Sequence, residues 1–207
     1  MPVMVMDVSS KRNAILDGAI AEFLAQGYAA ASMDRIASGA GVSKATVYSH
    51  FASKDRLFMA IMERLVLSKF ADILEPSQFA ARMNEPPERL LRHVAMTMLQ
   101  VPIQDREYLG LIRTVIAESG RFPALAQTFL KEITAVALHS LADYFRHCPH
   151  LHIADPEATA RIFVGAIAHY LITQYLLSGA EIIPLEESRL VDSLILMITC
   201  QKTEQGP

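Results

Sequence analysis

Apolar residues recur with a helical period along most of this 207-residue chain. The first such stripe lies early in the chain and consists of Ile15, Leu16, Ala19, Ile20, Phe23 and Leu24. Residues spaced in this way share one face of a helix, and Gly27 follows where that helix should end. Further stripes predict helices along the rest of the chain, and no segment shows the strict alternation typical of a strand. The pattern predicts an all-α protein.

Residues 32 to 58 predict two short helices joined by a tight turn, followed by the start of a longer helix. The first helix has an apolar face at i, i+3, i+4 and i+7, and glycines follow where the chain must turn. Ser32, Ser43 and Ser53 each stand where a side chain can cap the first turn of a helix. Helix, turn and second helix form the helix-turn-helix layout, in which the second helix enters the DNA major groove.

The outward side of the second short helix is rich in hydrogen-bond donors and contains no acidic residue. These donors are Ser43, Lys44, Thr46, Tyr48, His50 and Lys54. Donors are what phosphate and base-edge contacts require. A helical hairpin without a ligand is the alternative, because caps and glycine turns occur in every helical protein.

The run Gly-Val-Ser-Lys-Ala-Thr-Val-Tyr-Ser-His-Phe-Ala-Ser-Lys-Asp-Arg-Leu-Phe resembles the signature of the TetR/AcrR family of bacterial transcription regulators. The resemblance is strong over roughly residues 10 to 60. It implies a DNA-binding set of Ser32, Ser43, Lys44, Ala45, Thr46, Tyr48, Ser49, His50 and Lys54. In this set His50 and Lys54 would bind phosphate. Ala45 often appears as glycine in the family and Ser49 as an aromatic residue or histidine, which leaves the base preference open.

The family's organisation places a helix-turn-helix head at residues 9–69 and an effector-binding and dimerisation domain at residues 70–207. Asp155-Pro156-Glu157 predicts a helix start, and the helix that follows is apolar nearly all round. In the resembled family the last two long helices pair with their copies in a four-helix bundle. The predicted dimer interface is Ile162, Gly165, Ala166, His169, Leu176, Val191, Leu194, Ile195 and Ile198.

Methionines and aromatic residues of the second domain suit an adaptable apolar effector site. The candidates are Met96, Leu99, Arg113, Ile116, Phe129, Ile133, Gln174 and Tyr175, with the arginine, glutamine and tyrosine as polar anchors. Ordinary core packing is the alternative for each apolar member.

Other chemistry is not predicted. The cluster from His147 to His152 contains ligand types for zinc, but no second cluster supplies the remaining ligands. We expect no metal, no cofactor and no enzyme activity, since no catalytic motif appears. Two cysteines without a disulfide framework and residues 1–8 without a signal-peptide pattern favour the cytoplasm. The longest apolar run, residues 162–177, is shorter than the ~20 residues of a membrane span.

The net charge of −3 argues against non-specific coating of nucleic acid. From the helix-turn-helix pattern and the family resemblance we expect a homodimeric DNA-binding regulator. It would be a repressor that a small apolar effector releases from a palindromic operator. Two alternatives remain: a DNA-binding regulator without a small-molecule effector, and a helical enzyme or metal-binding protein whose head is vestigial.

Overall fold

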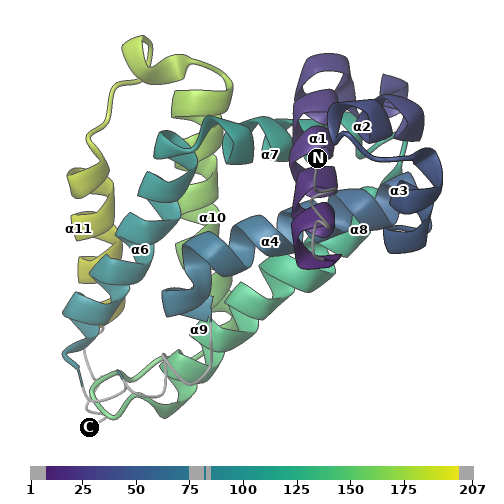
Figure 1. Ribbon diagram of the computed structural model, residues 1–207. Coiled ribbons are helices and arrows are strands. Elements are labelled where there is room, and N and C mark those ends of the chain that lie inside the picture. The colour runs from purple at the N-terminus through teal and green to yellow at the C-terminus, as the bar shows by residue number, and fades with distance from the viewer. Residues whose placement is uncertain (1–7, 75–81, 83–84, 201–207) are drawn as a thin grey trace, which may run out of the picture. The chain divides into compact units, whose positions relative to one another are not determined.

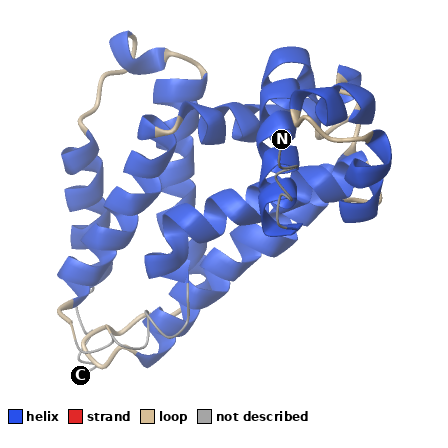
Figure 2. Cartoon of the chain, viewed as in Figure 1, coloured by secondary structure: helices blue, strands red, loops and turns tan. Residues whose placement is uncertain are grey.

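The computed structural model describes residues 8–74, 82 and 85–200, and every regular element in this part of the chain is a helix (Figures 1 and 2). The prediction of an all-α protein is thereby confirmed. Residues 1–7, where the sequence shows no signal-peptide pattern, lie outside the described residues. Within the described residues no helix is long and apolar enough to cross a membrane.

The helices follow one another closely along the chain. The first four are α1 (Val8–Ala30), α2 (Met33–Gly39), α3 (Lys44–His50) and α4 (Lys54–Leu74). The next four are α6 (Pro87–Gln104), α7 (Arg106–Glu118), α8 (Pro123–Phe129) and α9 (Ala135–His147). The last two are α10 (Pro156–Leu171) and α11 (Glu187–Thr199). Short π-helical turns, Leu130–Thr134 and Ile172–Leu176, follow α8 and α10, and a 3-10 turn covers Gly179–Glu181.

Side-chain caps set the starts of several helices where the sequence predicted them. The side chains of Ser32, Ser43 and Ser53 accept hydrogen bonds from the backbone N–H groups of Arg35, Thr46 and Arg56. The Asp155 carboxylate does the same for Ala158 at the start of α10, over 2.9 Å. Each cap satisfies an amide that has no partner within its own helix, and all four predictions are confirmed.

The chain forms two compact units. We call residues up to Val66 together with 107–130 the head unit, and residues 67–106 together with 131 onward the body unit. The sequence placed residues 107–130 with the C-terminal domain, whereas in the structure α7 and α8 belong to the same compact unit as α1, α2 and α3. The division thus follows packing between segments distant in sequence.

The core of the head unit contains an aromatic cluster. The Tyr28 ring stacks on Phe23 with centroids 5.5 Å apart, and it meets the ring of Phe58 edge-on at the same separation. Phe122, which precedes α8, packs edge-on against Tyr28 at 5.1 Å. Residues 107–130 therefore contribute a half-buried aromatic side chain to this cluster.

In the body unit, α6 packs against both α10 and α11, and α9 packs against α10. The side of α11 that faces α6 is fully apolar and consists of the buried residues Val191, Leu194, Ile195 and Ile198. An ion pair between Arg92 and Asp192, 2.6 Å apart, joins α6 and α11 at the surface.

Candidate nucleic-acid interface

The turn between α2 and α3 is held by the backbone. After Gly39, the last residue of α2, the chain passes through Ala40 to Gly41, which has a φ of 65°. A positive φ is accessible to glycine without steric cost, so Gly41 makes the sharp change of direction. The N–H of Val42 then donates to the carbonyl of Ala37 over 3.0 Å, which closes the turn against the end of α2.

The α3 helix is anchored from behind by one apolar side chain. Val47 and Ile36 of α2 are fully buried, and Phe51, which follows α3, is almost fully buried. The other side chains of α3 face outward or lie at its edge. Exposed or half-buried positions include Lys44, Ala45, Thr46, Tyr48, Ser49 and His50. The helix is thereby held rigidly on one side and presents polar groups on the other.

Three hydroxyl groups on this surface already have hydrogen-bond partners in α3 or its cap. Ser43 Oγ and Thr46 Oγ1 lie 2.8 Å apart, and Ser49 donates to the carbonyl of Thr46 over 2.8 Å. Tyr48 differs, because it is a large aromatic side chain that remains 46% exposed. A tyrosine that exposed combines an apolar face with a hydroxyl, which suits contacts with sugar, thymine methyl or phosphate.

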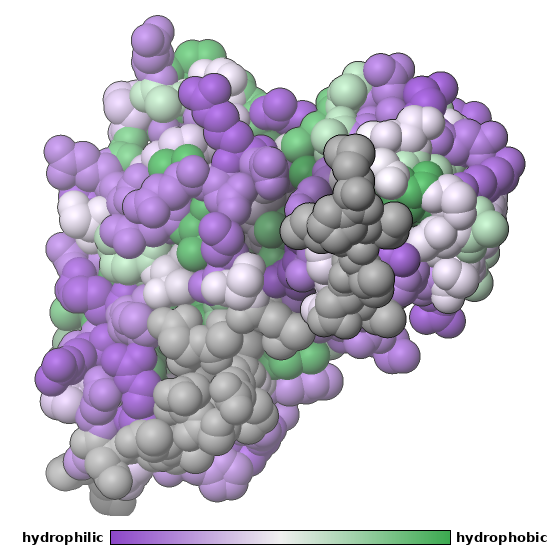
Figure 3. Space-filling view, viewed as in Figure 1, coloured by the Kyte–Doolittle hydropathy of each residue, from purple (hydrophilic) through white to green (hydrophobic). Residues whose placement is uncertain are grey.

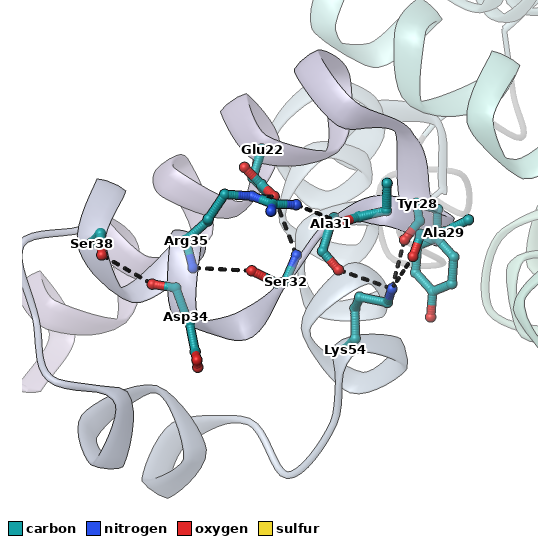
Figure 4. Close-up of polar contacts among 10 residues, drawn as sticks. Glu22, Tyr28, Ala29, Ala31, Ser32, Asp34, Arg35, Ser38 and Lys54 are labelled. Carbon is teal, nitrogen blue, oxygen red and sulfur yellow. Dashed lines mark hydrogen bonds and ion pairs between the residues drawn. The ribbon is translucent and has the colours of Figure 1, made fainter.

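A carboxylate that the sequence did not single out fixes the approach to α2 (Figure 4). Glu22 Oε1 accepts hydrogen bonds from the N–H of Ser32 over 3.2 Å and from Arg35 Nε over 2.6 Å. The Arg35 guanidinium also donates to the carbonyl of Ala30. Glu22 lies on α1, so these bonds tie the start of α2 to the first helix. Nothing in the local pattern marks this glutamate, since its partners lie ten and thirteen residues away.

Lys54 was expected to bind a phosphate, and the structure gives its ammonium group other partners (Figure 4). Its Nζ donates to the carbonyl oxygens of Tyr28, Ala29 and Ala31 over 2.6, 3.2 and 3.1 Å. An ammonium group has three donors, and three acceptors occupy them here. Burial lowers the pKa of Lys54, with partial compensation by the nearby Asp55. The geometry describes a cap for the end of α1, and a phosphate contact would have to replace one of these bonds.

The same corner of the head unit joins α1, α4 and the end of α7. The Tyr28 hydroxyl donates to the carboxylate of Asp55, and Glu118 Oε1 accepts from the N–H of Ala29 over 3.4 Å. Burial, together with the hydrogen bond to Asp55, raises the pKa of Tyr28. Sequence reasoning missed this network because its members are distant in the chain.

The predicted effector residues are divided between the two units. Arg113, Ile116 and Phe129 belong to the head unit, and Ile116 is 52% exposed. The members in the body unit are Met96, Leu99, Ile133, Gln174 and Tyr175. Of these, Leu99, Ile133 and Gln174 are buried. Gln174 Nε2 donates to the carbonyl of Ile183 over 2.9 Å, and the Tyr175 hydroxyl donates to Glu187 over 2.9 Å. The two polar anchors of the body unit therefore have hydrogen-bond partners there.

The predicted dimer interface requires a correction on α11. Its members Val191, Leu194, Ile195 and Ile198 are buried inside the subunit because they face α6, so they are not a free surface. The exposed apolar residues of α11 are instead Leu196 and Met197, at 61% and 60% exposure. On α10, Ile162, Gly165 and His169 are exposed as an interface requires. Ala166 of α10 and Leu176 of the π-helical turn that follows it are half-buried.

The histidine and cysteine cluster after α9 does not converge. Cys148 is buried beside the Tyr144 hydroxyl, whereas His150 and His152 are exposed. His147 Nδ1 lies 2.8 Å from the carbonyl of Asp143. Among the described residues, no three His, Cys, Asp or Glu side chains lie close enough together to hold a metal ion.

Comparison with known proteins gives two family matches that together cover most of the chain. Residues 15–61 match the profile of bacterial regulatory proteins of the tetR family. Residues 89–201 match the C-terminal domain of AefR-like transcriptional repressors.

Individual relatives are also transcription regulators. The chain is 46% identical over 56 residues to the HTH-type transcriptional activator FasR of Mycolicibacterium smegmatis, which covers 27% of this chain and 26% of FasR. It is 26% identical over 145 residues to the HTH-type transcriptional regulator AcrR of Shigella flexneri, covering 69% of this chain and 66% of AcrR. In both cases the chain spans less than two thirds of the relative's length.

Among solved structures, the Flavonoid-responsive Regulator FrrA is similar with a TM-score of 0.70 and 29% identity, over 91% of this chain and 96% of that one. The helix-turn-helix geometry, the profile matches at both ends of the chain and this structural similarity agree. The chain belongs to the TetR family of bacterial transcription regulators.

Proposed function

We propose that this regulator binds a palindromic DNA operator as a homodimer, with α3 of each subunit in the major groove. The observation that carries the proposal is the asymmetry of α3. Its Val47 is fully buried, while its exposed side presents donors and no carboxylate. Such a helix is held firmly by its own protein and offers the groups that phosphates and base edges accept from.

The proposed DNA contacts come from α3 and its flanks. Lys44 and His50 supply phosphate contacts at the two ends of the helix, and Thr46, Tyr48 and Ser49 approach base edges. Ser43 and Ser32 orient their helices through their caps, and Ala45 allows the backbone to come close. The contribution of Lys54 is indirect, because its hydrogen bonds to three carbonyls at and just after the end of α1 connect α4 with the helix that supports α2.

We place the dimer contact on the exposed faces of α10 and α11. Ile162 of α10 is 60% exposed, about as much as Leu196 and Met197 of α11. No atom lies within 4 Å of a Cβ added at Gly165. Large exposed apolar side chains typically mark an interface, and a glycine lets another helix approach closely. The homodimer would place two heads on half-sites about one helical turn, ~34 Å, apart or a multiple of it.

The direction of regulation is proposed to be repression. The longer of the two profile matches is to AefR-like transcriptional repressors. FasR, an activator, is similar over only 56 residues, 27% of this chain, so this match does not indicate the direction of regulation.

We further propose that a small apolar or aromatic effector releases the DNA. FrrA, similar over nearly its whole length, is described as responsive to flavonoids. In this chain the site would use the body-unit candidates Met96, Leu99, Ile133, Gln174 and Tyr175. The effector and the DNA would then bind best to different conformations of the regulator. Binding of either one would therefore lower the regulator's affinity for the other.

Selection of bound duplexes from fragmented bacterial DNA tests the first proposal and recovers the operator. Lys44→Gln and Tyr48→Ala should each weaken binding of the recovered duplex while leaving the subunit folded. Unchanged affinity in both variants would contradict the assignment of α3. A panel of flavonoids, added to the preformed complex and followed by fluorescence anisotropy, tests the effector; release by none of them favours a regulator without this class of ligand.

A further inference from the structure

Lys44, the first residue of the proposed recognition helix, is bound by a carboxylate from the preceding helix. Its Nζ lies 2.8 Å from Oδ1 and 3.1 Å from Oδ2 of Asp34. Both side chains are solvent-accessible, with Lys44 59% and Asp34 65% exposed. The pair joins α2 to α3 across the glycine turn, so it lies on the same part of the head that is proposed to meet DNA.

Asp34 is placed where an anion opposes DNA binding. It is the second residue of α2, and in helix-turn-helix proteins this helix crosses the DNA backbone. Duplex DNA is a dense line of negative charge, so an exposed carboxylate beside it is repelled. Asp34 also engages the cation that would offset this repulsion. Lys44 must leave Asp34 before it can bind a phosphate oxygen.

We propose that Asp34 is an intramolecular competitor for Lys44, occupying in the free protein the ammonium group that a DNA phosphate takes in the complex. Asp34 thereby sets the DNA affinity below the level that the donors of α3 alone would give. The inference rests on the proposed DNA binding by α3 and names a residue that tunes it.

The size of the effect follows from the exposure of the pair. Exposed ion pairs contribute little free energy. Loss of the Asp34–Lys44 pair should therefore change the DNA affinity of each head by up to about 5-fold. A dimer uses two equivalent heads far enough apart to act independently, so removal of both carboxylates should tighten binding by up to about 25-fold.

The salt dependence should change in the same direction. When Lys44 moves from Asp34 to a phosphate, one counterion leaves the DNA, but the freed carboxylate attracts a cation in return. Without Asp34 this compensation is lost. The slope of log K against log salt should therefore steepen by up to about 0.9 for each head. A purely structural role of Asp34 in folding α2 would not alter this slope.

The hydrogen bond that Lys44 donates to Asp34, reinforced by the charge of the carboxylate, raises the pKa of Lys44. The ammonium form is therefore the species that both acceptors compete for at neutral pH.

The experiment measures binding of the full-length protein to a fluorescent duplex of mixed sequence, about 40 base pairs long, over a range of salt concentrations. Asp34→Asn should bind more tightly and with a steeper salt slope than the wild type. Asp34→Ser serves as a second variant, because serine is well tolerated near a helix start. Thermal unfolding of each variant verifies that the head is folded.

Two further variants isolate the mechanism. Asp17→Asn removes the same charge from another exposed carboxylate of the head, which is paired with Arg64 at 2.7 Å; it should have a smaller effect. Asp34→Asn in a Lys44→Gln background should give little gain, since the cation being competed for is absent.

Each contrary result has a distinct meaning. If Lys44→Gln leaves binding unchanged, Lys44 is not a DNA contact and the competition is refuted, while Tyr48→Ala still tests the proposed role of α3. If Lys44→Gln weakens binding but Asp34→Asn does not tighten it, the competition is refuted and the proposed function stands. An equal gain from Asp17→Asn, or from Asp34→Asn without Lys44, would also overturn the competition, because general charge repulsion would then suffice.

Discussion

The ammonium group of Lys54 shows how one side chain links α4 to the end of α1 in the head unit. Its hydrogen bonds to Tyr28, Ala29 and Ala31 satisfy carbonyl groups at the end of α1 that have no helical partner. The Nζ atom also lies 4.7 Å from the centre of the Tyr28 ring, within range of a cation–π interaction. Loss of this ammonium group should therefore mainly lower the stability of the head unit, and not remove a direct DNA contact.

Lys54→Met should lower the free energy of unfolding by about 1 to 2 kcal/mol, because buried carbonyl oxygens lose a charged donor while the aliphatic stem is kept. Urea denaturation measures this loss. Lys131→Met is the matched control: its side chain is 82% exposed and pairs with its neighbour Glu132, so stability should hardly change. Equal stability of both variants would show that the cap contributes nothing.

Tyr175 provides a pH-dependent contribution in the body unit. Burial, and then the hydrogen bond to Glu187, raises the pKa of Tyr175 to about 12 from its ordinary 10. Below pH 10 the phenol is protonated in both the folded and the unfolded chain, so its contribution is complete. Between pH 10 and 12 the unfolded chain ionises first, and this stabilisation is progressively lost.

Tyr175→Phe should consequently lose less stability between pH 10 and 12 than the wild type does. We expect a difference of about 1 kcal/mol, after allowance for the partial exposure of the ring. Urea denaturation at several pH values, with the two proteins compared at each, measures it. Parallel pH profiles would contradict the raised pKa.

At the scale of elements, the approach of α1 to α2 depends on Gly18. A Cβ added there would lie 3.0 Å from the backbone nitrogen of Ala40, in the turn before α3. Backbone cannot move aside as a flexible side chain can. Gly18→Ala should therefore cost about 1 kcal/mol of stability, since the strain of overpacking exceeds the gain in helix propensity. The same shift should weaken DNA binding by moving the turn.

Gly165→Ala is the control for this substitution. Nothing lies within 4 Å of a Cβ added at Gly165, and the helix is otherwise regular. The subunit should gain up to about 1 kcal/mol from helix propensity. Thermal unfolding, at a protein concentration below that needed for dimerisation, compares the Gly18→Ala and Gly165→Ala variants. If both are stabilised, α1 and the turn after α2 can separate without cost.

The elements that could be predicted from the sequence are those set by local signals. Ser32, Ser43, Ser53 and Asp155 cap helices because each acts on an amide three residues away. The addition of residues 107–130 to the head unit was not predictable in this way. It depends on contacts such as Phe122 on Tyr28, between residues that no short-range pattern connects.

The sequence predicted the outward-facing residues of the candidate site but not the residues that hold its helices in place. Lys44, Thr46 and Tyr48 follow from the helix-turn-helix pattern, whereas Glu22 holds α2 through bonds that only folding brings together. The predicted interface residues of α11 are buried within the subunit for a related reason. Val191, Leu194, Ile195 and Ile198 form the stronger apolar stripe, and the strongest stripe of a helix packs on its own subunit before any partner is available.

At the scale of the whole molecule, two identical heads are needed to read a palindrome, so assembly should decide function. In the view of Figure 3 hydrophilic residues cover most of the surface. Leu196 and Met197 depart from this rule, as more than half of each side chain is exposed although both are strongly apolar. Burial in a dimer is the explanation that also fits the open space at Gly165.

The double variant Leu196→Glu, Met197→Glu should be a folded monomer. Both positions are exposed within the subunit, so the substitutions leave its core intact, but two carboxylates in each copy would be desolvated and mutually repelled in an interface. Sedimentation velocity should report half the wild-type mass, with an unchanged helical circular dichroism signal. DNA affinity should fall sharply, because a monomer contacts one half-site.

Two controls separate assembly from folding. Val136→Glu places the same charge on an exposed position of α9, 41% exposed, and should leave the dimer intact. Leu194→Ala removes a buried side chain facing α6 and should cost about 2 to 5 kcal/mol of unfolding free energy. If the double glutamate variant remains dimeric, the second copy binds elsewhere and the exposed face of α11 needs another partner. If Leu194→Ala alone dissociates the dimer while its subunits stay stable, the original assignment of that stripe to the interface would be restored.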